Sequence, residues 1–220
     1  MRKIFLTLAG LPRETSDYFV KILPKKPAEI KVCFIPTAAN PEVDKSFVQK
    51  SLDELRDVGI NNVTEVDLDK ENKNSLYEKL SSYDVIYVNG GNTFYLLDRV
   101  RKSGFDEIIT RLLDDEKIYM GVSAGSIIAG PNIESAGWKW LGIVDKNIVG
   151  LKNLQGLNLV SFETSPHFVE NDRKTLEENS KNVNYPIIAI NDEQAVLCIG
   201  DDYKIVGEGE KLIYNNSLKI

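Results

Sequence analysis

Apolar residues in the first half of the chain alternate between short continuous runs and helical spacing. Continuous runs of buried-strand length occupy residues 3–9, 30–35, 63–68, 84–88 and 118–122. Between them, apolar positions follow the spacing of helices with one buried face over residues 14–23, 44–58, 76–80, 93–100 and 105–113. Strands that alternate with helices favour a parallel sheet covered on both faces. We therefore predict an α/β fold with a mainly parallel sheet.

The pattern changes after residue 130. Residues 157–162 are predicted to form a strand, and residues 170–182 a charged surface helix. The remainder consists of four short apolar runs separated by Asp, Gly and Asn, at residues 187–190, 195–199, 203–206 and 211–214. Such runs are typical of antiparallel hairpins. No linker or internal repeat interrupts the sequence, so residues 1–220 are predicted to be a single domain.

One junction between a predicted strand and a helix carries candidate chemistry. Residues 121–125 read Gly-Val-Ser-Ala-Gly, after an apolar run and before small apolar residues that can begin a helix. This spacing lets a strained turn expose one hydroxyl, because glycine removes the Cβ atoms that would otherwise clash there. Ser123 is therefore the candidate nucleophile. The alternative is a plain tight turn.

A serine nucleophile needs a base, and the chain contains a single histidine, His167, after a predicted strand. A loop histidine with a structural hydrogen bond is the alternative, and a lysine base is another. The imidazole in turn needs a carboxylate. Asp192 and Glu193 follow the run 187–190, which a parallel sheet would bring to the same edge as Ser123. Ordinary turn residues look the same, so both interpretations stay open.

An oxyanion hole is expected beside the serine. The backbone N–H of Ala124 and one N–H from Gly90 or Gly91 are the predicted donors, since glycine permits a close approach. The alternative is a glycine turn between a strand and a helix. Chemistry of this kind uses a hydroxyl, an imidazole and backbone groups, so we predict no cofactor and no metal.

Charge and composition narrow the possible partners. The formal charge is −6 and the pI is near 5.0, with no basic run, which argues against nucleic acid or an anionic membrane. A small molecule or peptide is expected instead. The N-terminus lacks a signal-peptide pattern and no apolar stretch reaches transmembrane length, so the predicted location is the cytoplasm. Cys33 and Cys198 lie in apolar runs and are predicted to be buried rather than bridged.

Three segments together resemble the peptidase E family in their order and spacing. They are Gly-Gly-Asn-Thr-Phe at residues 90–94, Gly-Val-Ser-Ala-Gly-Ser at 121–126 and Pro-His-Phe at 166–168. That family includes aspartyl dipeptidases and cyanophycinases. The resemblance spans about residues 4–199 and implies a fold similar to class I glutamine amidotransferases, with serine in place of their cysteine. It also implies that Ser123 is the nucleophile, His167 the base, and Gly91 with Ala124 the oxyanion hole.

The resemblance extends to the acid of the triad. In cyanophycinase-like members, the glutamate of an Asp-Glu pair followed by a polar residue and alanine completes the triad, and Asp-Glu-Gln-Ala at residues 192–195 is similar. Other members use an aspartate roughly fifteen residues after the serine, where the nearest acid here is Glu134. We therefore predict Glu193 as the acid, with Asp192 and Glu134 as alternatives.

The resemblance also implies a substrate. Dipeptidases of the family recognise an N-terminal aspartate, whose side chain needs a cation; Arg173 is the first candidate and Lys139 the second. Asn92 is a further candidate for substrate binding. We predict a serine peptidase that acts on small peptides as a monomer or homodimer. The alternatives are an esterase of the α/β-hydrolase type, which places its acid before its histidine, and an inactive binding protein of the same fold.

Overall fold

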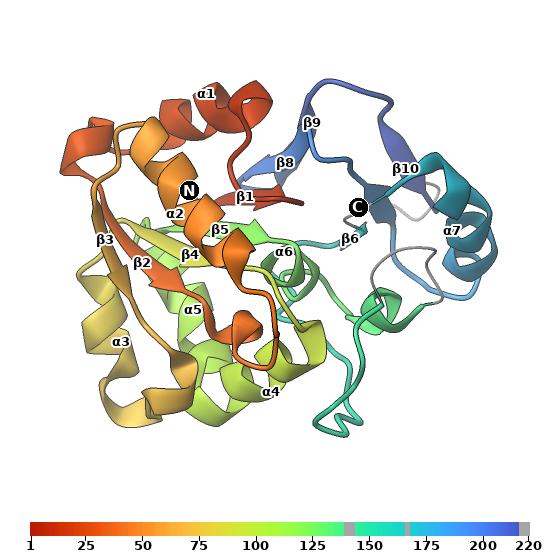
Figure 1. The fold of residues 1–220 in the computed structure, drawn as a ribbon, viewed down its shortest axis with the longest axis horizontal. Coiled ribbons are helices and arrows are strands. Elements are labelled where there is room, and N and C mark those ends of the chain that lie inside the picture. Colours follow the sequence, from red (N-terminus) through yellow and green to blue (C-terminus); the bar gives the residue numbers. More distant parts are fainter. Residues whose placement is uncertain (139–143, 166–167, 216–220) are drawn as a thin grey trace.

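The computed structural model describes residues 1–138, 144–165 and 168–215. Its main sheet has seven strands in the order β3-β2-β4-β5-β1-β8-β9. Their bounds are β1 Lys3–Thr7, β2 Lys31–Ile35, β3 Asn62–Glu65, β4 Val85–Val88, β5 Ile118–Val122, β8 Gln194–Ile199 and β9 Asp202–Gly207. The first five strands in this order are parallel to one another, whereas β8 runs antiparallel to β1 and β9 runs antiparallel to β8. The predicted fold class is confirmed (Figure 1).

Helices cover both faces of the main sheet. On one face, Phe19 of α1 (Arg13–Ile22) and Leu55 of α2 (Ser46–Asp57) pack on strand residues such as Phe34. The other face packs against four helices: α3 Lys73–Ser81, α4 Thr93–Ser103, α5 Phe105–Asp114 and α6 Ala124–Ile127. Short 3-10 turns connect the larger elements: η1 Pro27–Glu29, η2 Thr37–Ala39, η3 Leu68–Lys70, η4 Glu134–Gly137 and η5 Glu170–Asp172. The alternation of apolar runs and amphipathic segments is thus satisfied by burial on both faces.

A second sheet of three strands lies beside the first. Its order is β10-β7-β6, and its strands are β6 Glu163–Ser165, β7 Ile187–Ala189 and β10 Leu212–Tyr214. Leu176 of α7 (Arg173–Ser180) packs against Tyr185 and β7, so this sheet has a small core of its own. Antiparallel pairing was expected for the C-terminal strands, and β8–β9 and β7–β10 have it, but β7 also pairs in parallel with β6.

The predicted strand at residues 157–162 is wrong. The N–H of Leu157 donates to the carbonyl of Ile128 (2.7 Å), and the N–H of Leu159 donates to that of Ala129 (2.8 Å). These carbonyls lie just past the end of α6, where a helix leaves acceptors unsatisfied. The segment therefore runs along the end of a helix as irregular chain, and the strand begins only at β6. An apolar run does not by itself distinguish these two environments.

Two further expectations concern burial. Cys33 in β2 and Cys198 in β8 are free and buried, and burial raises the pKa of each thiol to about 12. They are structural residues, as predicted. None of the described helices has the length and apolarity needed to cross a membrane.

Candidate active site

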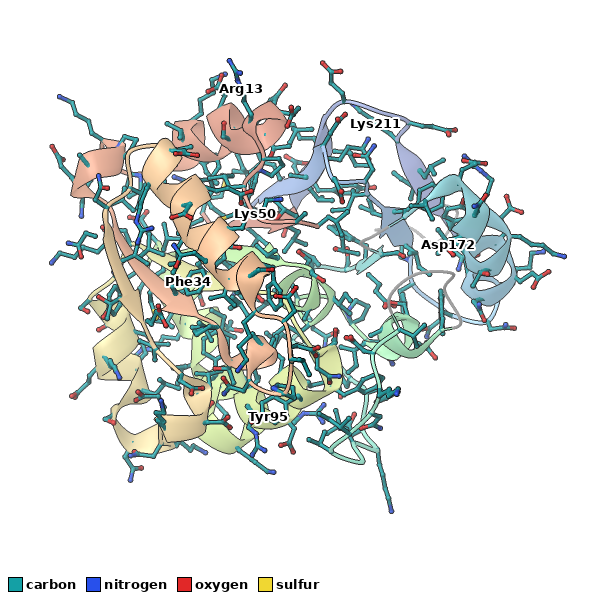
Figure 2. All side chains as sticks on the ribbon, in the orientation of Figure 1. Arg13, Phe34, Lys50, Tyr95, Asp172 and Lys211 are labelled. Atoms are coloured by element: carbon teal, nitrogen blue, oxygen red, sulfur yellow. The ribbon has the colours of Figure 1, made fainter. Side chains whose placement is uncertain are left out.

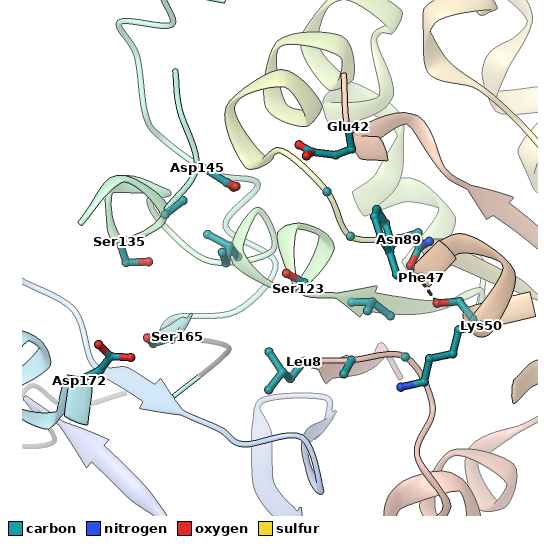
Figure 3. A pocket seen from close by; sticks show the side chains of 18 residues that line it. Leu8, Glu42, Phe47, Lys50, Asn89, Ser123, Ser135, Asp145, Ser165 and Asp172 are labelled. Carbon is teal, nitrogen blue, oxygen red and sulfur yellow. Dashed lines mark hydrogen bonds between the residues drawn. The ribbon is translucent and has the colours of Figure 1, made fainter. Parts of the chain in front are cut away.

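A cavity of about 290 Å³ opens where β1, β4 and β5 end. This is the carboxyl edge of the parallel strands, where open α/β sheets bind their ligands. Residues from the ends of these strands, from α2 and from the chain beyond α6 contribute to the lining: Leu8, Ala9, Gly10, Phe47, Lys50, Ser51, Asn89, Gly90, Gly91, Val122, Ser123, Ile127, Ser135, Ala136, Asp145, Ser165, Asp172 and also Glu42 (Figure 3). The cavity is therefore bounded on one side by the main sheet and on the other by segments near the second sheet.

Ser123 lies at this cavity in a strained backbone conformation. Its φ is 48° and its ψ is −109°, backbone angles that residues with a Cβ rarely adopt. Its N–H donates to the carbonyl of Thr7 at the end of β1 (3.0 Å), and its own carbonyl accepts from the N–H groups of Ser126 (2.8 Å) and Ile127 (3.0 Å). Bonds on both sides hold the strained residue between β1 and α6. The hydroxyl is thereby presented at the cavity (Figure 3).

The two glycines of the elbow are required sterically. A Cβ on Gly121 would lie 2.6 Å from the carbonyl oxygen of Gly125, and one on Gly125 would overlap the carbonyl oxygen of Val88. The expectation that glycine relieves clashes at this turn is confirmed. The next serine has a different task, since the Ser126 hydroxyl lies 2.7 Å from the carbonyl oxygen of Thr7 and 2.8 Å from that of Gly121. Ser126 is a structural residue of the elbow.

The residues predicted to donate to the oxyanion lie close to Ser123 in space or in the chain. A Cβ on Gly90 would lie 3.1 Å from the Cβ of Ser123, so the backbone after β4 runs directly beside the serine. Gly91 has a φ of +131°, and a Cβ there would lie 2.7 Å from the nitrogen of Ala39. Only glycine fits this position. Ala124 begins α6, and the first N–H groups of a helix have no acceptor within it. The fold thus brings Gly90, Gly91 and Ala124 together.

The predicted base lies outside the described residues, as does Lys139. His167 falls between two described residues that both line the cavity, Ser165 at the end of β6 and Asp172 in η5. The chain therefore reaches the cavity on either side of the histidine. Its role as the base remains a prediction.

The predicted acids are at the carboxyl edge but outside the cavity lining. Asp192 and Glu193 are exposed in the turn before β8, whose Ala195 pairs with Thr7 at the end of β1. The predicted strand at residues 187–190 was expected to bring these two acids to the carboxyl edge of the main sheet, but β7 belongs to the second sheet. The antiparallel pairing of β8 with β1 brings them to that edge instead. Glu134 also lies outside the described lining and accepts a hydrogen bond from the Tyr185 hydroxyl (2.7 Å).

The two predicted substrate-binding residues are engaged with the protein itself. The Asn92 side chain caps α4 by accepting from the N–H of Tyr95 (2.9 Å), and it donates to the carbonyl of Lys146 (3.0 Å). Arg173 pairs with Glu170 (2.6 Å) and Glu210 (2.8 Å), hydrogen bonds that hold its pKa above the usual value. Neither residue belongs to the described lining of the cavity. Lys50 of α2 is the cation among the described lining residues.

Several lining residues were not anticipated from the sequence. Asp172 is a carboxylate only 2 % exposed. Asp145 accepts the backbone N–H of Thr93 (2.7 Å) at the start of α4, and burial raises its pKa. Asn89 is fully buried and accepts from the Ser51 hydroxyl (3.2 Å). The position of Asn89, directly after a predicted strand and before two glycines, could have identified it as a site residue. Asp172, in contrast, lies in a charged stretch without a distinguishing signal.

A buried glutamate stands behind one end of the cavity. Glu163 of β6 is fully buried, and burial raises its pKa to about 8 although the Ser135 hydroxyl donates to it. Ser135 lines the cavity, so the glutamate contacts a cavity residue directly. Within residues 1–138, 144–165 and 168–215, no group of three or more His, Cys, Asp or Glu side chains is arranged to hold a metal ion.

Comparison with known proteins gives evidence about the family of this chain that is independent of the geometry of the site. The model of peptidase family S51 matches residues 8–206. An uncharacterized peptidase of Listeria monocytogenes is 38% identical over 139 residues, which are 62% of this chain and 65% of the relative. An uncharacterized peptidase of Pasteurella multocida is 32% identical over 185 residues, covering 82% and 86% of the two chains. The crystal structure of a candidate peptidase E protein from Listeria monocytogenes EGD-e superposes with a TM-score of 0.80 at 28% identity, covering 95% of this chain and all of that one.

Proposed function

The chain belongs to peptidase family S51 and is a serine-type peptidase, and from this premise we propose that it cleaves dipeptides with an N-terminal aspartate through Ser123. The observation that carries the proposal is the strained elbow, which presents the Ser123 hydroxyl at the cavity beside the backbone of Gly90. Strain of this kind persists where the surroundings hold it, and it gathers at active sites. The cavity of about 290 Å³ is near the lower end of small-molecule sites, which suits a dipeptide.

In the proposed mechanism, the Ser123 oxygen attacks the peptide carbonyl carbon while His167 takes the hydroxyl proton. The carbonyl oxygen becomes an oxyanion, which the N–H groups of Gly91 and Ala124 stabilise as its charge develops. His167 then gives its proton to the leaving amine, and the C–N bond breaks to leave an acyl ester on Ser123. Water, deprotonated by His167, hydrolyses this ester.

Glu193 is the carboxylate that we propose to orient His167, on the strength of its resemblance to the family pattern. The antiparallel pairing of β8 with β1 supports this role, since it puts the turn at the carboxyl edge of the main sheet. For the aspartyl side chain of the substrate, we propose Lys50 in place of Arg173, because Lys50 lines the cavity and Arg173 is paired with two glutamates elsewhere.

Replacement of the nucleophile tests the proposal. Ser123→Ala should fold normally and lose nearly all hydrolysis of Asp-Leu, on the order of 10⁶-fold as in other serine triads. It should also lose covalent labelling by a fluorophosphonate, detected by intact-protein mass spectrometry. Ser126→Ala is the matched control, since it removes the structural hydroxyl of the same elbow and should keep the label at Ser123. If Ser123→Ala retains a tenth of the activity, Ser123 is not the nucleophile.

The remaining features of the proposal follow from the sequence. We propose a single domain, a cytoplasmic location, a peptide substrate, and a monomer or homodimer as the assembly. The likeness to class I glutamine amidotransferases also remains a prediction.

A further inference from the structure

The turn η2 lies directly against the glycine that we propose as an oxyanion donor. The carbonyl of Ala38 in η2 accepts the N–H of Asn92 (2.9 Å), the residue after Gly91. A Cβ on Gly91 would lie 2.2 Å from that same carbonyl oxygen, so the two backbones are in contact. The turn also packs beside α4, which follows the glycines (Figure 1). The position of the Gly91 N–H therefore depends on where η2 lies.

Polar side chains fasten η2 to η3. Thr37 is fully buried, and its hydroxyl donates to the Asp67 carboxylate (3.0 Å) while it accepts the N–H of Leu68 (2.8 Å). Asn40 directly follows η2, and its side chain donates to Asp67 (3.1 Å) and to Asp69 (2.7 Å). Hydrogen bonds to charged acceptors are stronger than those between neutral groups. The two carboxylates therefore hold the turn at its first residue and just after its last.

Asp69 connects this turn to α4. The hydroxyl of Tyr95, labelled in Figure 2, donates to one carboxylate oxygen of Asp69 (2.5 Å), and the Arg99 guanidinium pairs with the other (2.8 Å). Arg99 also lies over the Tyr95 ring, 4.6 Å from its centroid. The oxygen that accepts from Tyr95 also accepts from Asn40. A single carboxylate thus links the turn that contacts Gly91 with the helix that begins two residues after it.

We propose that Asp69 is a positioning residue of the oxyanion hole, a proposal that rests on the peptidase function above. Asp69 does not belong to the described lining of the cavity, so it acts through the backbone of Gly91 rather than on the substrate. Its side chain is 25% exposed, and an ion pair that is partly exposed contributes little to global stability. Its effect on the rate is larger, because a displacement of about 1 Å in a positioned group can lower a rate about a hundredfold.

Removal of the Asp69 carboxylate tests this role by steady-state kinetics on Asp-Leu. Asp69→Ala should lower kcat about tenfold and leave KM within about twofold, because the oxyanion forms only in the transition state. Tyr95→Phe removes one donor to the carboxylate and should lower kcat about threefold. Asp84→Ala is the matched control and should keep kcat within about twofold. Its carboxylate pairs with Lys25 (2.8 Å) and accepts the N–H of Lys31 (2.9 Å), but it lies before β4, at the opposite end of that strand from the glycines.

Amide hydrogen exchange, measured by NMR, gives a readout that does not depend on catalysis. The Asn92 N–H should exchange at least about fivefold faster in Asp69→Ala than in the wild type, because its hydrogen bond to Ala38 opens more often. The Ser123 N–H, which donates to the Thr7 carbonyl (3.0 Å), is the internal reference and should keep its exchange rate. In Asp84→Ala, the exchange rate of Asn92 should match that of the wild type.

The proposal is overturned if Asp69→Ala lowers kcat no more than Asp84→Ala does, if the loss appears in KM, or if the exchange rate of Asn92 is unchanged. Equal acceleration at Asn92 and Ser123 also overturns it, because the substitution would then loosen the whole protein rather than the oxyanion loop. Wild-type protein that cleaves no peptide refutes the peptidase function instead, and the exchange rate of Asn92 then decides whether Asp69 holds the loop.

Discussion

Glu163 should make the stability of the protein fall as the pH rises through the neutral range. Burial raises the pKa of this carboxyl from 4.5 to about 8 in the folded protein, while the unfolded chain keeps the ordinary value. Between these two pH values the folded state retains a proton that the unfolded state releases. The stabilising contribution is therefore complete below pH 4.5 and is lost progressively as the pH rises to about 8.

The size of the effect follows from the same two values. Each pKa unit of difference corresponds to about 1.4 kcal/mol, so the shift from 4.5 to about 8 sets a ceiling of roughly 5 kcal/mol. That ceiling is a large part of the stability of a typical domain, which is about 5–15 kcal/mol. Relaxation around a newly charged Glu163, together with the hydrogen bond from the Ser135 hydroxyl, reduces the observed value. We expect a decrease of about 2–4 kcal/mol between pH 5 and pH 8.

Glu163→Gln provides the assay. Glutamine has nearly the same shape and does not titrate, so urea unfolding followed by circular dichroism at pH 5, 6, 7 and 8 should show a flatter profile for the variant. The control is Glu178→Gln on α7, an exposed glutamate that should leave the wild-type slope intact. The difference between the two profiles isolates Glu163 from the other titrating groups. Equal slopes in wild type and Glu163→Gln would show that the buried carboxyl does not hold its proton.

Two further predictions concern specificity and the triad. Lys50→Gln should narrow the preference for Asp-Leu over Asn-Leu at least about tenfold, because Lys50 lines the cavity, whereas Arg173→Ala should leave it within about twofold. Steady-state kinetics on the two peptides decides whether Lys50 or Arg173 recognises the aspartate. Lys174→Gln is the matched control, since the ion pair of Lys174 with Glu178 (3.8 Å) resembles that of Lys50 with Glu54 (3.7 Å). Glu193→Gln should lower kcat on the order of 10⁴-fold, and Asp192→Asn less than tenfold. A larger loss in Asp192→Asn would reassign the acid.

The fold was largely predictable because its central strands are buried on both faces. Continuous apolar runs such as residues 118–122 have no other stable environment next to amphipathic helices, and β5 has these same bounds. The failure at residues 157–162 has the opposite cause. Those residues are apolar because they pack against the large core on one face of the main sheet, but their N–H groups bond to carbonyls at the end of α6. Periodicity reports burial and does not reveal which acceptors a segment will meet.

The candidate site likewise has one part that the sequence predicted and another that it did not. Ser123 and the two glycines after β4 were found from the sequence, since each lies directly after a strand whose end is fixed by the parallel sheet. The other half of the cavity depends on long-range packing. Ser135 of η4, Ser165 of β6 and Asp172 of η5 come from three separate segments, and all three line the cavity. No local sequence pattern distinguishes a buried aspartate in a charged stretch from one that is exposed to solvent.

The end of β1 connects the two halves of the proposed triad. The Thr7 carbonyl accepts the N–H of Ser123 (3.0 Å), while Thr7 pairs with Val122 on one side and with Ala195 on the other. Neighbouring strands are about 4.8 Å apart, so β5 and β8 are separated by about 10 Å at this edge. A serine oxygen, an imidazole ring and a carboxylate joined by two hydrogen bonds of about 2.8 Å span a comparable distance. This spacing between β5 and β8 supports the proposed role of Glu193, which precedes β8 by one residue.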